Sequence, residues 1–347
     1  MSNINTEVIK LTEENFKKSI KKGAELIRKE EVVAFPTETV YGLGGAGFSP
    51  LAIRKIFEAK GRPQDNPLIL HIGSMEMLDD IATDIRDYVY LLMEKFWPGP
   101  ITFVLNKKSV VPMEVSAGLT TVGVRFPSER TAQALILEAG LPIAAPSANT
   151  SGKPSPTNAE AVFEDMKGRI PLILDGGQTD IGIESTVLLS TGEKPIILRP
   201  GKVSYEDIRE VVASVEISAG LKQGEKPMSP GQKYRHYAPK ADMYLFVGKF
   251  NDVASRILFE EARWELEDKK IGILCFDETR ERYSSEHVIS LGSYFNREEV
   301  SRNLFNSLRD FDKLGVDVIL SESVEEKGIG RAIFERMRRA AKEVVNV

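Results

Sequence analysis

Hydrophobic positions near the start of the chain recur at helical spacing and then give way to short apolar runs. From Thr12 to about Lys29 the spacing predicts a helix, and the run from Glu31 to Phe35 predicts a strand that ends at Pro36. The pair Ser49-Pro50 supplies an N-cap and a first-turn proline, so the next helix is expected to end near Gly61. The pattern therefore begins as an alternation of helices and strands.

Further strand-like runs follow, separated by helical or turn segments. They lie at residues 68–72, 101–105, 121–126, 143–145, 172–174, 185–189 and 196–198. We predict an α/β domain with a large mixed, twisted sheet and helices.

A second alternation begins beyond residue 240. The pattern predicts strands at 243–247, 271–276, 288–291 and 316–320, and helices at 253–266, 298–314 and 332–345. This order is typical of a smaller, Rossmann-like parallel α/β domain. Between the two domains, glycines and prolines from about Ala219 to Pro239 break every periodicity and predict a linker. We place the first domain at 1–215, the linker at 216–240 and the second domain at 241–347.

Composition narrows the class of protein. With 42% hydrophobic and 28% charged residues, the chain is typical of a soluble globular protein. A net charge of -5 argues against a general electrostatic affinity for nucleic acid, although it leaves room for a local basic patch. The one cysteine, Cys275, lies in an apolar run and suits a reducing, cytoplasmic setting. The first residues resemble no signal peptide and no run reaches about eighteen apolar residues, so we expect neither secretion nor membrane insertion.

Two glycine-containing segments invite a nucleotide-binding interpretation. Gly42-Leu-Gly44-Gly-Ala-Gly47 matches the dinucleotide fingerprint in letters, but six residues separate it from the preceding strand and no ribose-binding acid follows. We expect a glycine loop that is flexible or allows close approach. The segment Ser151-Gly-Lys153-Pro lacks the upstream glycine of a P-loop, so P-loop ATP binding is not expected.

A run of polar groups set in rigid turns predicts an anion-binding pocket. In Lys60-Gly-Arg62-Pro63-Gln-Asp65-Asn66-Pro67 the prolines restrict the backbone and pre-organise the polar groups. The alternative is that Lys60 and Arg62 only complement a helix dipole. His71, on the next strand, is either a satisfied core histidine or a ligand-binding group. The three histidines and single cysteine show no metal-ligand spacing, so no structural zinc is expected.

Three further segments carry candidate chemistry. The polar run Ala145–Ser155 is either a long turn or a nest of N–H and hydroxyl groups for phosphate, and no persuasive base for a serine nucleophile is evident. Arg199, like Arg62 and Arg125, is anchored beside a proline or at a strand end. Gly328-Ile-Gly330 begins either an anion-binding helix N-terminus or an amphipathic helix with a solvated basic face.

Taken in order, these motifs resemble the threonylcarbamoyl-AMP synthase family, in its longer two-domain form. The resemblance is nearly continuous from about residue 33 to 201 and extends into the linker and the second domain. It rests on Pro36-Thr-Glu-Thr39-Val-Tyr-Gly-Leu-Gly44, Lys60-Gly-Arg62-Pro-Gln-Asp-Asn66-Pro-Leu, Trp97-Pro-Gly-Pro100, Gly123-Val-Arg125-Phe-Pro, Ala145-Pro-Ser147-Ala-Asn149-Thr-Ser-Gly, Glu184-Ser185-Thr-Val and Ser229-Pro-Gly-Gln-Lys-Tyr-Arg-His-Tyr-Ala-Pro239.

The resemblance implies an enzyme, a nucleotidyltransferase that uses ATP with magnesium. L-Threonine and bicarbonate or CO2 would form an N-carboxylated threonine, whose carboxylate attacks the α-phosphate of ATP and releases pyrophosphate. Threonylcarbamoyl-AMP would then pass to a separate transferase complex that modifies certain tRNAs to threonylcarbamoyladenosine. Such chemistry depends on positioning and charge neutralisation more than on covalent catalysis.

The resemblance also implies residue roles. Lys60 and Arg62 would be catalytic, and Thr39, His71, Arg125 and Ser185 would hold threonine. The groups around ATP would be Lys60, Arg62, Asn66, Thr121, Ala145 through its backbone, Ser147, Asn149, Ser155, Arg199 and the linker residue Tyr234. Tyr234 would close the site against water, with His236 as the other candidate for closure. The second domain would be an accessory domain, and regulation of the linker is a hypothesis for its role.

Two alternatives stay open. A module that binds tRNA or double-stranded RNA would show salt-dependent RNA retention. A carbamoyl-group transferase that uses preformed carbamoyl phosphate would form product without bicarbonate.

Overall fold

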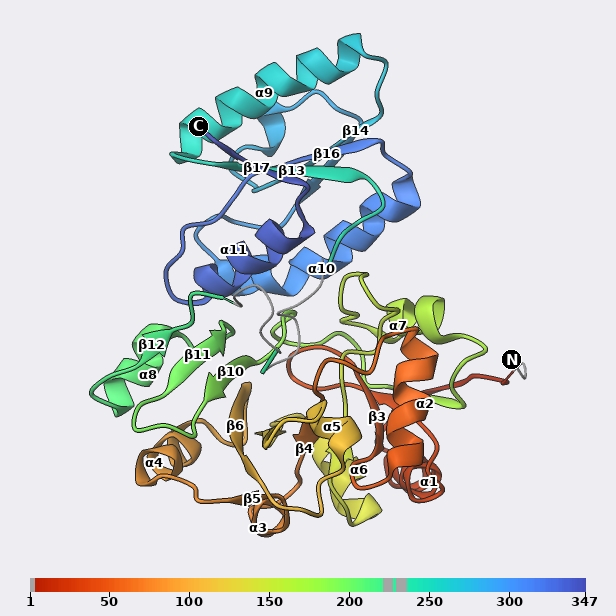
Figure 1. Cartoon of the computed structure of the whole chain (residues 1–347). Helices are drawn as coiled ribbons and strands as arrows, with labels where there is room; N and C mark the ends of the chain where they lie inside the picture. The colour runs from red at the N-terminus through yellow and green to blue at the C-terminus, as the bar shows by residue number, and fades with distance from the viewer. Residues whose placement is uncertain (1–3, 221–226, 229–235) are drawn as a thin grey trace. The chain divides into compact units, whose positions relative to one another are not determined.

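The computed structural model describes residues 4–220, 227–228 and 236–347. These residues divide into two compact units (Figure 1). The first contains the described residues up to 220 and residues 227–228, apart from 152–154 and 181–183. Those two short segments belong to the second unit, together with the described residues from 236 onward.

The first unit is built on one large sheet, which within the described residues has 12 strands. The sheet contains parallel pairs such as β1 with β9 and antiparallel pairs such as β2 with β3, so it is mixed, as the sequence predicts. In order across the sheet the strands are β1 (Glu7–Lys10), β9 (Leu172–Asp175), β2 (Val33–Phe35), β3 (Gly42–Ala46), β8 (Ile143–Ala144), β4 (Ile69–His71), β7 (Thr121–Arg125), β6 (Ile101–Lys107), β10 (Thr186–Leu189), β11 (Ile196–Arg199) and β12 (Glu216–Ile217), with β5 (Ala82–Thr83) paired to β6.

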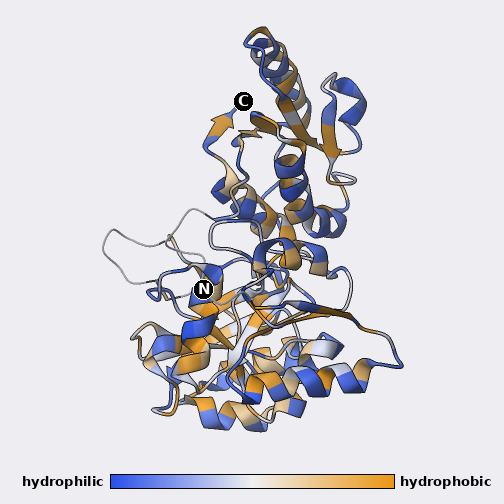
Figure 2. Cartoon of the chain, turned by 90° about the vertical axis from the view of Figure 1, so that its right-hand side faces the viewer, coloured by the Kyte–Doolittle hydropathy of each residue, from blue (hydrophilic) through white to orange (hydrophobic). Residues whose placement is uncertain are grey.

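Hydrophobic side chains cover both faces of this sheet. Along β2, Val33 and Phe35 belong to one core cluster and Ala34 to another, as expected for side chains that alternate across a strand. In Figure 2 hydrophilic and hydrophobic positions alternate along the helices, as expected for helices that bury one side. The helices of this unit are α1 (Phe16–Arg28), α2 (Pro50–Lys60), α3 (Glu76–Ile81), α4 (Asp87–Phe96), α5 (Met113–Ser116), α6 (Arg130–Ala139), α7 (Ala159–Met166) and α8 (Tyr205–Val211).

The predicted boundaries of α2 are confirmed, and their causes are visible. The Ser49 hydroxyl accepts a hydrogen bond from the Ala52 N–H at 3.1 Å, and Pro50 occupies the first turn. At the other end Gly61 has φ +62°, the left-handed conformation that glycine adopts at little cost. Lys60 is therefore the last helical residue and Arg62 lies just beyond the helix.

The glycine-rich segment 42–47 is not a loop, which corrects the expectation from sequence. Residues Gly42–Ala46 form β3, a buried strand between β2 and β8. A Cβ atom on Gly44 would lie 2.6 Å from both Phe35 and Ile143, so the side chains of neighbouring strands leave no space there. The expected close approach is present, but it serves packing inside the sheet.

The second unit has a 5-stranded parallel sheet in the order β15-β14-β16-β13-β17, which confirms the predicted Rossmann-like fold. Figure 1 shows α9 on one side of this sheet and α10 with α11 on the other. The strands are β13 (Asp242–Val247), β14 (Ile271–Cys275), β15 (His287–Ser290), β16 (Val318–Ser321) and β17 (Glu343–Asn346), and the helices are α9 (Phe250–Leu266), η1 (Arg280–Arg282), α10 (Arg297–Leu314) and α11 (Ile329–Ala340).

The end of the chain differs from its prediction. We expected one helix over 332–345, but α11 ends at Ala340 and residues 343–346 form β17 beside β13. Two adjacent valines, Val344 and Val345, favour a strand at this edge, and pairing with β13 overrides the helical spacing.

Cys275 is a free thiol buried in β14, as predicted. At the end of the predicted linker, the buried Tyr237 ring stacks on Phe305 at 4.9 Å between centroids, within the second unit. Among the described residues no helix is long and apolar enough to span a membrane. Residues 221–226 and 229–235 of the predicted linker, among them Tyr234, which we expect to close the site, lie outside the described residues.

Candidate functional site

Strand register brings His71 and Arg125 together. β4 and β7 are parallel neighbours in which His71 lies opposite Arg125, at the last residue of each strand. Both residues are buried, each with 4% of its surface exposed. Two polar side chains at adjacent carboxyl ends of a sheet are well placed to bind a ligand, and the sequence prediction assigned both to one substrate.

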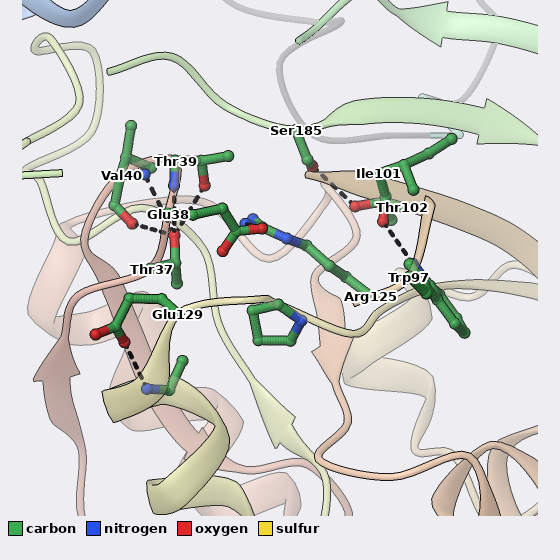
Figure 3. A network of polar contacts seen from close by, with 12 residues as sticks. Thr37, Glu38, Thr39, Val40, Trp97, Ile101, Thr102, Arg125, Glu129 and Ser185 are labelled. Atoms are coloured by element: carbon green, nitrogen blue, oxygen red, sulfur yellow. Dashed lines mark hydrogen bonds and ion pairs between the residues drawn. The ribbon is translucent and has the colours of Figure 1, made fainter. Parts of the chain in front are cut away.

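Thr102 and Ser185 extend this cluster from the next strands. Thr102 of β6 pairs with Arg125 across the antiparallel ladder, and Ser185 directly precedes β10. The two hydroxyl oxygens share a hydrogen bond of 2.8 Å, drawn in Figure 3. Arg199 fixes the backbone of Ser185, because its Nε and Nη2 atoms donate to the Ser185 carbonyl oxygen at 3.1 and 3.0 Å. Nη2 of Arg199 also donates to the Ser185 hydroxyl at 3.2 Å, so Arg199 contacts both the backbone and the side chain of Ser185.

The turn after β2 places Glu38 in the same cluster. The Thr37 hydroxyl donates to the Val40 carbonyl oxygen at 2.7 Å and accepts from the Thr39 N–H at 3.2 Å. This hydroxyl-bonded turn directs the carboxylate of Glu38 toward Arg125, as Figure 3 shows. The Oε1 atom of Glu38 lies 2.7 Å from Nη2 of Arg125.

Several buried polar atoms in this cluster lack hydrogen-bond partners among the described residues. They include Nδ1 of His71, Nε and Nη2 of Arg125 and both carboxylate oxygens of Glu38. Burial, followed by the charge of Arg125, lowers the pKa of His71 to about 3, so its imidazole is neutral at physiological pH. Buried polar groups are usually paired, and unpaired ones gathered at strand ends indicate a ligand site.

A second group of predicted residues is organised around Lys60. The buried ammonium of Lys60 donates to the carbonyl oxygens of Ser147 and Asn149, the latter at 2.6 Å. The Ser147 hydroxyl donates to Oδ1 of Asn149 at 2.5 Å. Residues that lie almost ninety positions apart in the sequence are therefore in direct contact, at the end of α2 and at residues 147–149.

The turn after α2 contributes Arg62 and Asn66. Nη2 of Arg62 lies 3.4 Å from the carbonyl oxygen of Asn66, and the guanidinium lies 5.8 Å from the centre of the Phe57 ring. The Asn66 side chain is fully buried, yet neither its oxygen nor its nitrogen has a hydrogen-bond partner among the described residues. Thr121 begins β7, where it lies opposite Asn106 of β6, two residues before Gly123, which pairs with Ile69 of β4.

The remaining predicted residues lie in the same unit. The Ala145 N–H already donates to the Ile69 carbonyl oxygen at 3.0 Å, so only its carbonyl is left for the backbone contact expected there. Ser155 is buried, and its hydroxyl donates to Oε1 of Glu184 at 2.6 Å. Tyr234 lies outside the described residues.

Sequence reasoning missed some members of the cluster. Glu38, Thr37 and Thr102 were not among the predicted site residues, although all three lie in it. Glu38 carried a usable signal, because an acid flanked by two threonines directly after a predicted strand is an unusual group to place inside a sheet protein. Thr102 gave no such signal, since it lies inside an apolar strand and only the register brings it to Arg125.

Comparison with known families assigns both parts of the chain. A family model described as "Telomere recombination" matches residues 25–201. A second model, described as "Threonylcarbamoyl-AMP synthase, C-terminal domain", matches residues 203–342.

Relatives and solved structures agree with these models. The chain is 46% identical to the threonylcarbamoyl-AMP synthase of Pyrococcus abyssi over 97% of its length and 98% of the relative's. It is also 46% identical to that of Bacillus subtilis, over 93% of its length and 92% of the relative's. A structure described as "Crystal structure of P. abyssi Sua5 complexed with L-threonine" has a TM-score of 0.93 and 44% identity, and the match covers 99% of both chains. The chain therefore belongs to the threonylcarbamoyl-AMP synthase family, in the form with two domains.

Proposed function

We propose that the chain makes L-threonylcarbamoyl-AMP and pyrophosphate from L-threonine, bicarbonate or CO2, and ATP. Family membership and the names of its relatives support synthesis of threonylcarbamoyl-AMP. The observation that carries the assignment to this site is the group of buried polar atoms on Glu38, His71 and Arg125, and on Asn66 in the turn after α2, that make no hydrogen bond with a described residue. A folded enzyme leaves such atoms unpaired at a cost that a bound substrate can offset.

The cluster at the ends of β4 and β7 suits threonine. Arg125 offers a guanidinium for its carboxylate, and the hydroxyls of Thr39 and Ser185 and the neutral imidazole of His71 offer partners for its side-chain hydroxyl and amine. A related protein has been solved as a complex with L-threonine, which supports this half of the proposal.

The group around Lys60 suits ATP. Arg62 offers a charge for the phosphates, and Asn66 and Thr121 offer polar atoms beside it. Lys60 fixes the backbone of Ser147 and Asn149, while Ser155, Arg199 and the carbonyl of Ala145 complete the surroundings of the adenylate. Tyr234 keeps its proposed role in closing the site, on sequence grounds alone.

The proposed chemistry asks the protein for positioning and charge neutralisation. The N-carboxylate of threonine attacks the α-phosphorus of ATP, a new O–P bond forms and the bond to pyrophosphate breaks. Lys60 and Arg62 would hold the phosphates in line and balance charge on the leaving group.

Magnesium enters this proposal as part of the MgATP substrate. It would neutralise phosphate charge and keep most of its ligands as water and phosphate oxygens, which is usual for this ion. Within the part of the chain that the structure describes, no group of three or more His, Cys, Asp or Glu side chains could hold a metal ion.

The product would pass to a tRNA threonylcarbamoyl transferase complex in the cytoplasm. We propose this partner because the resemblance to the family implies it, and this location because a single, buried cysteine suits a reducing compartment. The RNA-binding alternative is not favoured, because the relatives that match nearly the whole chain are named as synthases.

Pyrophosphate release tests the proposal. We expect release only with ATP, magnesium, L-threonine and bicarbonate together, and a loss of about a hundredfold or more in Arg62→Ala. Arg54→Ala is the matched control, because Arg54 lies on α2 with 47% of its side chain exposed and only a 3.8 Å ion pair to Glu114. Pyrophosphate release that is indifferent to threonine would contradict the proposal. Formation of a carbamoylated product from carbamoyl phosphate, without bicarbonate, would favour the transferase alternative.

A further inference from the structure

Glu38 is a buried carboxylate to which the proposed reaction assigns no role. Its side chain is 7% exposed and that of its neighbour Arg125 is 5% exposed. The two are 2.7 Å apart, but neither carboxylate oxygen of Glu38 makes an aligned hydrogen bond with any described residue. The pair is therefore held by charge, with most of its hydrogen-bonding capacity unmet.

Such a pair is costly by itself. Two charges removed from water need well-aligned hydrogen bonds to offset their desolvation, and this pair lacks them. The backbone turn around Glu38 is stabilised by the Thr37 hydroxyl, which bonds the N–H groups of residues 39 and 40 and the carbonyl oxygen of residue 40. Two opposite charges therefore lie side by side in a site where other buried polar atoms also lack hydrogen-bond partners.

We propose that Glu38 and Arg125 together form a receptor for the zwitterion of threonine, in which Glu38 binds the α-ammonium and receives its proton during N-carboxylation. This inference rests on the proposed function. The carboxylate and ammonium of an α-amino acid lie a few ångströms apart, so one molecule can separate the pair and give each charge an opposite partner. The number of buried charges of each sign stays matched when threonine binds.

The proton transfer balances. The ammonium gives one proton to the Glu38 carboxylate and becomes a neutral amine. The nitrogen lone pair then attacks the carbon of bicarbonate, an N–C bond forms, the C–OH bond breaks, and the hydroxide leaves with the second amine proton as water. The products are the N-carboxylated threonine and neutral Glu38.

The new charge favours this distribution of protons. N-carboxylation places an anion where the ammonium had been, and two carboxylates side by side disfavour ionisation of both. Protonated Glu38 avoids that repulsion and donates a hydrogen bond to the new carboxylate, which is the nucleophile of the next step. The other ionisable groups around it are Arg125, the neutral His71 and Glu129, whose pKa is raised mainly by burial and slightly by Glu38.

Glu38→Gln separates this role from packing, because the amide keeps the shape and removes the charge. By calorimetry we expect the variant to bind L-threonine about tenfold to a hundredfold more weakly. Wild type should bind threonine much more tightly than 2,3-dihydroxybutanoate, which has a hydroxyl in place of the ammonium, and the variant should lose that preference. Glu129→Gln is the control, since Glu129 is a partly buried carboxylate whose side chain accepts a hydrogen bond from the Ala132 N–H and caps α6.

The pH dependence of kcat/KM distinguishes proton transfer by Glu38 from a purely structural role, because loss of packing alone would not change its slope. Without an internal proton acceptor the variant must use threonine whose amine is already neutral, so its kcat/KM should rise about tenfold per pH unit below the ammonium pKa. Wild type and Glu129→Gln should show no such slope near neutral pH. Glu38→Asp retains a carboxylate and should keep the preference for the ammonium, with a lower rate.

The outcomes distinguish this inference from the proposed function. If wild type releases no pyrophosphate in response to threonine and bicarbonate, the proposed function fails. If wild type is active but Glu38→Gln keeps its threonine affinity and a flat pH profile, Glu38 has no such role. If Glu38→Gln does not fold, equal binding of threonine and 2,3-dihydroxybutanoate to wild type would overturn the inference, and a clear preference would uphold it.

Discussion

The ammonium nitrogen of Lys60 lies 2.6 Å from the carbonyl oxygen of Asn149, and Lys60 is only 2% exposed. This bond joins the end of α2 to the polar segment that follows β8. Because the ammonium donates to a backbone carbonyl, Lys60 has a structural role as well as its proposed catalytic role.

We predict that Lys60→Met lowers both stability and ATP affinity. The methionine fills the same space but leaves two buried carbonyls without their donor, which should cost about 1–3 kcal/mol. Urea unfolding followed by the fluorescence of Trp97, in a Trp264→Phe background, reports on the first unit, since these are the chain's two tryptophans. Unchanged stability would show that water replaces the ammonium readily.

A double-mutant cycle should reveal the cost of isolating one member of the Glu38–Arg125 pair. Arg125→Met alone leaves a buried carboxylate and should destabilise the first unit by about 3–5 kcal/mol. Adding Glu38→Gln should recover most of that loss, because the remaining groups are neutral. The same unfolding measurement gives all four corners of the cycle, and strictly additive effects would argue against coupling.

Acid should destabilise the protein through His71. Its pKa falls from an ordinary 6.5 to about 3 in the folded state, so only the unfolded chain binds the proton between these values. The contribution of neutral His71 to the free energy of unfolding is therefore complete above pH 6.5. It declines as the pH falls toward 3, by up to about 1.4 kcal/mol per pH unit. His71→Gln should remove this component between pH 6.5 and 5, where most carboxylates are still ionised. Parallel curves for wild type and variant would contradict a neutral, buried imidazole.

Arg199→Lys should impair threonine use through Ser185. The lysine cannot reproduce the two-pronged contact with the Ser185 carbonyl oxygen, so the serine loses its fixed position. We expect the KM for threonine to rise by about tenfold, which is what the loss of about 1.4 kcal/mol of binding would give. Initial rates at varied threonine and varied ATP separate the two substrates, and a rise confined to ATP would place Arg199 on the nucleotide alone.

Patterns in the sequence predicted the elements that local chemistry controls. The cap at Ser49, the end of α2 at Gly61 and the alternation of the second unit were all predicted, because each depends on neighbours along the chain. β3 was missed since its glycines have no strand propensity, and its identity comes from the space left by Phe35 and Ile143.

In the candidate site, as in the fold, sequence patterns predicted the groups that depend on local neighbours and missed those that depend on strand register. The polar turns and the resemblance identified the residues that the structure groups around Arg125 and Lys60. The pairing of Thr102 with Arg125 could not be predicted from the pattern of residues. That relationship depends on the register between β6 and β7, which is a long-range property of the sheet. Glu38 was quoted within a motif, but its meaning required the distance to Arg125.

The burial of Cys275 has a practical consequence for experiments with fluorescent dyes. Its thiol is enclosed in β14, and burial raises its pKa to about 12, so maleimides should react with it slowly. Cysteines introduced at exposed positions would then be labelled selectively with no need to remove the native one. A dye pair attached this way, one dye on each unit, would allow single-molecule measurements during turnover.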